Sequence, residues 1–207
     1  MKGTLYFDGA CLPRNPGGVA TFGWVLEWKG KKEKGNGVET ERGTNNIAEY
    51  SGLIHGLEKA LEKGIERLVA LGDSQLVIYQ LQGRYSVRSE RIRPYYLRAK
   101  RLLEGFKSVK LVWIPRKKNS EADRLSVEAY VYYELLREYS GKKNTIKSCK
   151  KLRNGLYRVN GYEVRFSSRK YSCNCPSFKR KNSAELLKRS SLAVPCKHIA
   201  FVYFSGR

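Results

Sequence analysis

Residues 3–10 of the 207-residue chain read GTLYFDGA, an apolar run that contains a single carboxylate, Asp8. Such a run is typical of a β-strand inside a sheet. A charged side chain in this setting is costly to bury unless it is paired or binds a cation. Asp8 is therefore the first candidate for a functional residue.

Strand and helix patterns follow this stretch in a definite order. Strands are expected at 3–10, 20–28, 33–40, 68–71 and 109–114, and helices at 46–63, 74–81, 90–104 and 120–139. Three consecutive strands suggest a meander, and the short apolar run 68–71 is typical of a buried parallel strand. The order βββαβααβα predicts an α/β fold with a mixed five-stranded sheet and flanking helices.

The chain is strongly basic, with 41 Lys and Arg against 19 Asp and Glu and a net charge of +22. Because 41% of its residues are hydrophobic, the composition favours a folded protein that binds a polyanion, nucleic acid first. Residues 1–140 carry a net +7 and residues 141–207 a net +15. This break predicts two domains, 1–140 and 141–207, with a short polar linker at about 140–146.

The sequence offers no sign of a membrane segment. It has no run of about 18 apolar residues, and its first residues enter a strand pattern directly instead of a signal peptide. We therefore expect a soluble, cytoplasmic protein with no membrane partner. Five cysteines, an odd number, favour metal ligands over a disulfide framework.

Two further carboxylates each have a structural explanation as well as a functional one. Glu49 lies three residues after Asn46, so Asn46 could be the N-cap of a helix and Glu49 could bond back to its amide, as in a capping box. When Glu49 is considered by itself, this structural interpretation is favoured over a functional one. Asp73 could cap the helix that begins at Ser74. It also follows a parallel strand, where ligand sites of α/β folds gather.

Asp123 is the fourth carboxylate, and its position three residues after Ser120 also fits a capping box. A functional interpretation requires all four to converge. Gathered carboxylates repel one another unless divalent cations neutralise them, and hard oxygen ligands suit Mg²⁺ or Mn²⁺. Two such ions about 4 Å apart can activate water and stabilise the leaving oxygen in phosphodiester hydrolysis.

Four sequence blocks carry a resemblance. They are Tyr6–Ala10, Thr44–Glu49, Gly72–Gln75 and Asn119–Leu125. In order and spacing, over about residues 1–135, they resemble the signature blocks of type 1 ribonuclease H. The resemblance implies a ribonuclease H-like fold and an endonuclease that cuts the RNA strand of an RNA–DNA hybrid, leaving 3′-hydroxyl and 5′-phosphate ends. It implies that Asp8 bridges both ions and that Asp123 helps hold the ion that activates water. Glu49 and Asp73 would hold the ion beside the leaving oxygen.

The resemblance also assigns four polar residues to the substrate, in contact with ribose 2′-hydroxyls, phosphates or minor-groove base edges. They are Asn15, Asn45, Asn46 and Gln75. Such contacts suit the chemistry, because the 2′-hydroxyl distinguishes RNA from DNA. The structural alternative places Asn15 in a turn and makes Asn46 a helix cap. In each residue such a structural role can coexist with substrate contact.

The chain departs from bacterial members of the family in two places. They have a longer loop with a histidine before the last aspartate, whereas residues 113–119 are short and contain none. This resembles the archaeal-type branch, where an arginine can replace the histidine. Arg116 is thus a candidate for aiding proton transfer or product release, with a solvated loop cation as the alternative. Residues 82–94 are too few for the basic protrusion that many bacterial members use to grip the hybrid.

The C-terminal part contains a pattern of three thiols and one imidazole. Its members are Cys173, Cys175, Cys196 and His198. They form a complete tetrahedral zinc set, and the spacing CxC–x20–CxH resembles the SWIM zinc-binding motif over about residues 157–205. Cys11 and Cys149 lack a partner pattern.

We expect the C-terminal part to form a small ββα-like module with one structural zinc. The expected strands and helix lie at 146–152, 156–159, 162–166 and 198–204. A module of this size needs a metal because its core is small. The basic runs 179–181 and 188–189 suit phosphate contacts, although SWIM modules are also thought to dock proteins.

The leading hypothesis is a metal-dependent ribonuclease H whose zinc module aids nucleic-acid binding. One alternative is a nuclease of the same fold that acts on double-stranded RNA or branched DNA. Another is a nucleic-acid-binding protein with a vestigial nuclease site, against which the intact set of four carboxylates argues. Asn45, Asn46 and Gln75 favour a duplex that contains RNA but leave RNA–RNA cleavage open.

Overall fold

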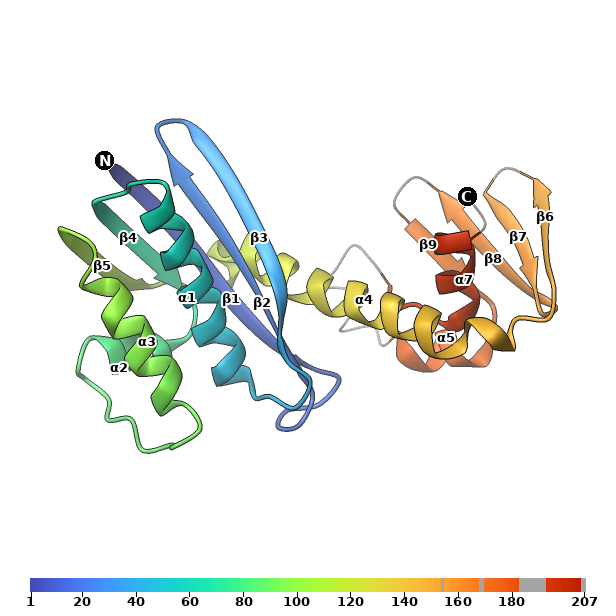
Figure 1. The fold of residues 1–207 in the computed structure, drawn as a ribbon, viewed down its shortest axis with the longest axis horizontal. Helices are drawn as coiled ribbons and strands as arrows, with labels where there is room; N and C mark the ends of the chain where they lie inside the picture. The colour runs from blue at the N-terminus through green and yellow to red at the C-terminus, as the bar shows by residue number, and fades with distance from the viewer. Residues whose placement is uncertain (154, 168–169, 183–192, 206–207) are drawn as a thin grey trace. The chain divides into compact units, whose positions relative to one another are not determined.

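Strand β1 (Lys2–Leu12), which contains Asp8, is the central strand of a five-stranded sheet in a computed structural model. The structure describes residues 1–207 except 154, 168–169, 183–192 and 206–207 (Figure 1). It divides into two compact units, residues 1–130 and 131–207, which are described separately. No helix in the described part is long and apolar enough to cross a membrane.

The first unit is a mixed sheet with strand order β3-β2-β1-β4-β5. Its other strands are β2 (Val19–Trp28), β3 (Lys31–Thr40), β4 (Arg67–Gly72) and β5 (Ser108–Trp113). The first three strands form an antiparallel meander, whereas β4 and β5 run parallel to β1. The expected mixed five-stranded α/β sheet is confirmed.

Four helices accompany this sheet. They are α1 (Asn45–Glu62), α2 (Gln75–Leu81), α3 (Arg93–Leu103) and the long α4 (Ser120–Lys142). Helix α1 packs on β1 and β2, and α3 packs against α1 (Figure 1). Leu5 and Phe7 of β1 form the buried core with Leu53 and Leu57 of α1.

Two glycines allow helices to approach the central strands from opposite faces of the sheet. A Cβ on Gly9 would lie 2.1 Å from the backbone of Ala48 and Glu49, and a Cβ on Gly23 would lie 2.6 Å from the carbonyl oxygen of Ala122 in α4. These distances are too short for any other residue type without a backbone shift. Both helices that carry candidate carboxylates therefore lie directly against the sheet at the level of Asp8.

The second unit has more strands than the sequence pattern predicts. It is an antiparallel sheet of β6 (Cys149–Arg153), β7 (Leu156–Val159), β8 (Tyr162–Ser167) and β9 (Lys170–Cys173), with helices α5 (Pro176–Lys181) and α7 (Lys197–Ser205). Asn160 and Gly161 join β7 to β8 in a two-residue turn with positive φ at both positions, as a type I′ hairpin requires. Strand β9 went unpredicted because it is only four residues long and ends in a cysteine.

The compact units meet inside α4, ten residues before the boundary that composition suggests. Helix α4 continues through the composition break to Lys142. Leu135 of α4 belongs to the core of the second unit, and Lys181 pairs with Glu134 at 2.8 Å and with Glu138 at 2.7 Å. The second unit thus includes the C-terminal half of α4, since packing and not charge decides where it begins.

Replacing Gly9 by alanine tests the close approach of α1. We expect the free energy of unfolding to fall by about 1–3 kcal/mol, because the new methyl group overlaps the α1 backbone. Chemical denaturation followed by circular dichroism measures this change. The matched control is Gly141→Ala in α4, where a Cβ meets nothing within 4 Å and helix propensity predicts a gain of up to about 1 kcal/mol. Equal stability of Gly9→Ala and the native protein would contradict the packing.

Candidate functional site

The carboxylate of Asp8 is buried on the face of β1 that α4 covers. Its pKa is raised well above the ordinary value by burial and by the negative charges of Asp73, Asp123 and Glu49. The hydroxyl of Ser126 in α4 donates to Asp8 Oδ2 at 3.0 Å and partly opposes this rise. All four candidate carboxylates therefore lie close enough to interact electrostatically.

Glu49 lies in the second turn of α1 and is not a helix cap. The N-cap is Thr44, whose side chain accepts from the amide of Ile47, so the suggested cap position of Asn46 is wrong. Glu49 instead accepts hydrogen bonds from Ser74 Oγ and, at 3.4 Å, from Asn45 Nδ2. Burial, reinforced by the charge of Asp73, raises its pKa to about 7.

Asp73 follows β4 directly and does not cap α2 either. Ser74 is the N-cap, and its hydroxyl accepts from the amide of Val77. The Asp73 carboxylate accepts a hydrogen bond from Asn119 Nδ2 at 2.6 Å, and its backbone carbonyl accepts from Trp113 Nε1 at 3.1 Å. Its carboxylate is thus oriented by a side chain that comes from the start of α4.

Asp123 and Arg116 form an ion pair at the same pocket. Asp123 is buried in the first turn of α4, and the guanidinium of Arg116 donates to its Oδ1 at 2.6 Å. The Arg116 side chain is 58% exposed, so the pair is open to solvent on one side. Arg116 is consequently a charge that faces the carboxylates and not a loop cation pointing away from them.

Two residues that sequence reasoning missed hold these groups in place. Asn119 is buried, and its Nδ2 donates both to the backbone carbonyl of Phe7 at 2.8 Å and to Asp73. Its Oδ1 is buried without a partner in the described part of the chain. Ser126 Oγ lies within hydrogen-bond distance of Asp8 and of the carbonyl of Asp123. Asn119 opens the fourth signature block but is given no role there, and Ser126 lies one residue beyond that block, so neither was assigned to the site from sequence.

The chemistry of this pocket fits divalent cations. Three carboxylates gather around a fourth, buried one. Burial, reinforced by the neighbouring negative charges, raises the pKa values of Asp8 and Glu49. Hard cations with oxygen ligands relieve such repulsion. The pocket therefore has the donor set of a divalent-metal site.

Two of the residues suggested for substrate contact, Asn15 and Asn45, form a hydrogen-bond chain that reaches Glu49. Asn15 Oδ1 accepts from the backbone amide of Asn45 at 3.0 Å, and Asn45 Oδ1 accepts from the amide of Cys11 at 3.1 Å. Asn46 is half-buried at the start of α1, and Gln75 is exposed at the start of α2. The β1–β2 loop is thereby tied to the helix that carries Glu49.

The second unit brings together the four residues of the zinc pattern. Cys173, Cys175, Cys196 and His198 are all buried, and their ligand atoms lie within 4.8 Å of one another. His198 Nδ1 is 3.8 Å from the sulfurs of Cys173 and Cys196, close to the ~3.5 Å that tetrahedral Zn–S and Zn–N bonds require. A hydrogen bond from Cys173, with His198 nearby, lowers the pKa of Cys196. The set fits a closed structural zinc site.

The basic residues near this cluster do not all face solvent. Lys179 and Arg180 of α5 are exposed, but Lys181 turns inward to Glu134 and Glu138. The predicted basic pair at 188–189 lies outside the described residues. Phosphate contacts from α5 are therefore limited to its two exposed cations.

Comparisons with known proteins agree with both units. The family described as Reverse transcriptase-like matches residues 6–129, and the SWIM zinc finger family matches residues 157–206. Ribonuclease HI of Halobacterium salinarum is 41% identical over 125 residues, which is 60% of this chain and 62% of that protein. Bifunctional protein Rv2228c of Mycobacterium tuberculosis is 41% identical over 88 residues, 42% of this chain and 24% of its own length. The chain thus spans less than two thirds of either relative.

Solved structures show the same fold. The crystal structure of RNase H1 from Halobacterium salinarum has a TM-score of 0.58 and 39% identity, covering 63% of this chain and 98% of that one. The N-terminal RNase H domain of Rv2228c also scores 0.58, with 34% identity and coverage of 62% and 92%. LC11-RNase H1, solved in complex with an RNA/DNA hybrid, scores 0.56 with 29% identity, covering 61% of this chain and 95% of that one.

The family match over residues 6–129 and the archaeal RNase H1 structure, 98% of which is matched, both cover the part of the chain that holds the five-stranded sheet. Together they make this chain a member of the type 1 ribonuclease H family, with a SWIM zinc finger following its ribonuclease H fold.

Proposed function

We propose that this chain hydrolyses the RNA strand of RNA–DNA hybrids. The observation that carries the proposal is the convergence of Glu49, Asp73 and Asp123 on the buried Asp8, which raises the pKa of Asp8. The family relationship supports it, as does the hybrid in the structure of LC11-RNase H1. A polyanionic duplex also suits the strongly basic composition.

In this proposal the four carboxylates hold two Mg²⁺ or Mn²⁺ ions. When bound, the ions supply an activated water and stabilise the leaving oxygen, so that cleavage leaves 3′-hydroxyl and 5′-phosphate ends. Asp8 would help hold both ions, because the charges of the other three carboxylates all act on it. Ser126 and Asn119 keep Asp8 and Asp73 in their orientations, which lowers the entropic cost of assembling the site.

Arg116 has a position suited to a role in turnover. Its guanidinium pairs with the carboxylate of Asp123. Because this pair is exposed on one side, the arginine can move from the carboxylate to the phosphate product and aid its release. Asn15, Asn45, Asn46 and Gln75 would contact the duplex beside the carboxylates, with the 2′-hydroxyl selecting the RNA strand.

The zinc module is proposed to add affinity for the duplex. Lys179 and Arg180 on α5 are exposed cations that no carboxylate pairs in the described part of the chain. Phosphate contacts made by such cations are independent of base sequence. The module would therefore raise affinity without changing the cleavage chemistry.

Substitution of Asp8 by asparagine tests the proposed reaction. With labelled RNA–DNA, RNA–RNA and DNA–DNA duplexes and Mg²⁺ or Mn²⁺, we expect the native protein to cut the RNA of the hybrid. We expect Asp8→Asn to lose at least about 10³-fold in rate, since the central ligand contributes several kcal/mol. Glu41→Gln, at an exposed carboxylate of the same unit, is the control and should retain full activity. Full cleavage by Asp8→Asn, or without divalent cations, would refute the two-metal mechanism.

The affinity for Mg²⁺ should depend on pH in a defined direction. Glu49 has a pKa of about 7, so below this pH a cation must displace its proton. Affinity measured by titration calorimetry should therefore weaken by about tenfold per pH unit below pH 7 for each proton displaced, and level off above it. The Glu49→Gln variant should bind more weakly and show a shallower dependence. A flat profile between pH 5.5 and 8 in the native protein would contradict this expectation.

Elemental analysis tests the zinc ligands. The native protein should contain one zinc per chain, and Cys196→Ser and His198→Ala should lose most of it, because each removes one of four ligands. Cys149→Ser is the matched control, since Cys149 is an exposed free thiol outside the cluster. The zinc-depleted variants should also bind the hybrid more weakly. Undiminished zinc in either ligand variant would exclude the proposed set.

A further inference from the structure

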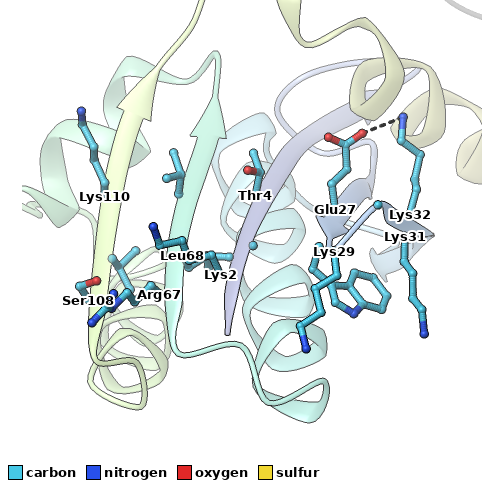
Figure 2. Close-up of a pocket in the computed structure, with 15 residues that line it drawn as sticks. Lys2, Thr4, Glu27, Lys29, Lys31, Lys32, Arg67, Leu68, Ser108 and Lys110 are labelled. Atoms are coloured by element: carbon cyan, nitrogen blue, oxygen red, sulfur yellow. Dashed lines mark ion pairs between the residues drawn. The ribbon is translucent and has the colours of Figure 1, made fainter.

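Two hollows outside the carboxylate cluster are each lined by several cations. The larger has a volume of about 840 Å³ and lies at the end of the first unit where β1, β4 and β5 begin (Figure 2). Of its lining residues only Leu68 is buried, and cations such as Lys2, Lys29 and Arg67 are exposed. Its polar groups are therefore already solvated, and none of them requires a ligand.

The second hollow lies in the second unit, beside the zinc pattern. It has a volume of about 390 Å³ and is bounded by the end of α4, the β7–β8 turn, α5 and the start of α7. We call it the His198 pocket. Its polar lining includes Lys142, Asn160, Tyr162, Arg180, Lys197 and His198, all of which belong to the second unit.

His198 is the residue of this pocket that calls for a ligand. It is 3% exposed, and its Nε2 is buried without a hydrogen-bond partner among the described residues. Its Nδ1 lies 3.8 Å from the sulfurs of Cys173 and Cys196, so a zinc ion held there leaves the proton on Nε2. Zinc-bound histidines usually donate that proton to a carboxylate, a carbonyl or water. Nε2 therefore lacks the acceptor that such a histidine normally has.

The unpartnered nitrogen lies toward the pocket. Cys173 and Cys196, which Nδ1 approaches, do not line the pocket, whereas His198 does. The ring edge that remains for the pocket is consequently the one that carries Nε2. Tyr162 also lines the pocket, and its ring packs on the imidazole with 4.9 Å between the ring centroids. Because Tyr162 is 36% exposed, a small movement of its ring would open Nε2 to a ligand.

Unpaired positive charge lines the same pocket. Arg180 is exposed, and neither Arg180 nor Lys197 pairs with a carboxylate in the described part of the chain. The one carboxylate among the lining residues that the structure describes is Glu138, which Lys142 contacts at 3.1 Å and Lys181 at 2.7 Å. Two cations therefore neutralise Glu138, and the charges of Arg180 and Lys197 are left for an anion.

The start of α7 adds to this preference for an anion. Lys197 and His198 are the first two residues of this nine-residue helix. Amides in the first turn of an α-helix have no acceptor within the helix, and the helix dipole is positive at this end. Phosphate groups bind such helix starts and pair with the planar guanidinium of arginine. A phosphate oxygen also supplies the acceptor that Nε2 of His198 lacks.

We propose that the His198 pocket binds one phosphate group of a nucleic-acid backbone. Arg180 and Lys197 contact the phosphate oxygens, and Nε2 of His198 donates a hydrogen bond to one of them. The inference rests on the proposed function, because it takes nucleic acid as the partner of the zinc module. His198 then has two roles, since its Nδ1 holds zinc and its Nε2 binds the phosphate.

Titration of inorganic phosphate into the zinc-loaded full chain tests the pocket. The chain has two histidines, His55 and His198, so long-range proton–nitrogen correlation spectra resolve both, and a His55→Gln variant assigns them. At constant pH and ionic strength, we expect the Nε2 signal of His198 to shift and to saturate. Arg180→Gln should weaken this binding by about 5- to 10-fold. His55, which lies in the first unit at 3.5 Å from Glu39, should not shift.

Fluorescence anisotropy with an RNA–DNA hybrid, without added Mg²⁺ or Mn²⁺, tests whether the phosphate belongs to nucleic acid. Arg180→Gln should bind the hybrid about 5- to 10-fold more weakly than the native protein at low salt. The matched control is Lys150→Gln, which removes one charge from an exposed position of the same unit outside the pocket. Its affinity should stay within about twofold. Both variants should keep one zinc per chain, since neither side chain is a zinc ligand.

Three results would overturn the inference. The first is a His198 signal that phosphate leaves unchanged. The second is an equal loss of hybrid affinity in Arg180→Gln and Lys150→Gln, which would indicate diffuse attraction by net charge. The third is a phosphate-dependent shift of His198 together with hybrid binding that Arg180→Gln leaves intact, because the pocket would then take free phosphate only.

Cleavage assays separate this inference from the proposed function. If the hybrid is cut normally and phosphate leaves His198 unchanged, only the pocket is refuted. If no hybrid is cut under any divalent-cation condition, the proposed reaction fails, and the phosphate titration of His198 still tests the pocket.

Discussion

The mutual repulsion of four carboxylates, one of them buried in the central strand, is the constraint on which this structure depends. Burial of Asp8 is unfavourable, and its three acidic neighbours make the charged form less favourable still. Arg116, Ser126 and Asn119 offset part of that cost through hydrogen bonds. The remaining negative charge is available for the divalent cations that we propose.

Close packing of two helices on the sheet holds the carboxylates near one another despite their mutual repulsion. Gly9 lets α1 approach one face of the sheet and Gly23 lets α4 approach the other, so the carboxylates on the two helices cannot relax away from Asp8. Protein interiors are close-packed, so neither helix can move away from the sheet unless its neighbours move as well. The site is therefore preorganised before any cation binds.

Charge is segregated within the chain. The first unit combines an anionic pocket with a basic hollow at one end of its sheet, while residues 141–207 carry most of the net positive charge around a set of zinc ligands. The nucleic acid that we propose as the substrate would thus be attracted by surfaces outside the carboxylate cluster, and the cluster itself would remain selective for cations.

Several features were predictable from sequence because they depend on local pattern. The alternation of apolar residues predicts the order of strands and helices, and the spacing of Cys173, Cys175, Cys196 and His198 predicts their grouping. Helix caps were less predictable: Thr44 and Ser74 take the positions suggested for Asn46 and Asp73. Any of several neighbouring polar side chains can accept a hydrogen bond from the free amides at a helix N-terminus. The backbone conformation decides which of them does so.

By itself, therefore, the sequence determined the fold class, the order of the elements and the candidate ligands, since these follow from periodicity, spacing and the resemblance of four sequence blocks to a known family. The tertiary structure decided what depends on contacts between distant residues. These are the approach of Asn119 to Asp73 across 46 positions, the inclusion of half of α4 in the second unit, and the meeting of Arg180, Lys197 and His198 at one pocket. Such contacts reflect packing summed over many elements, which no local pattern encodes.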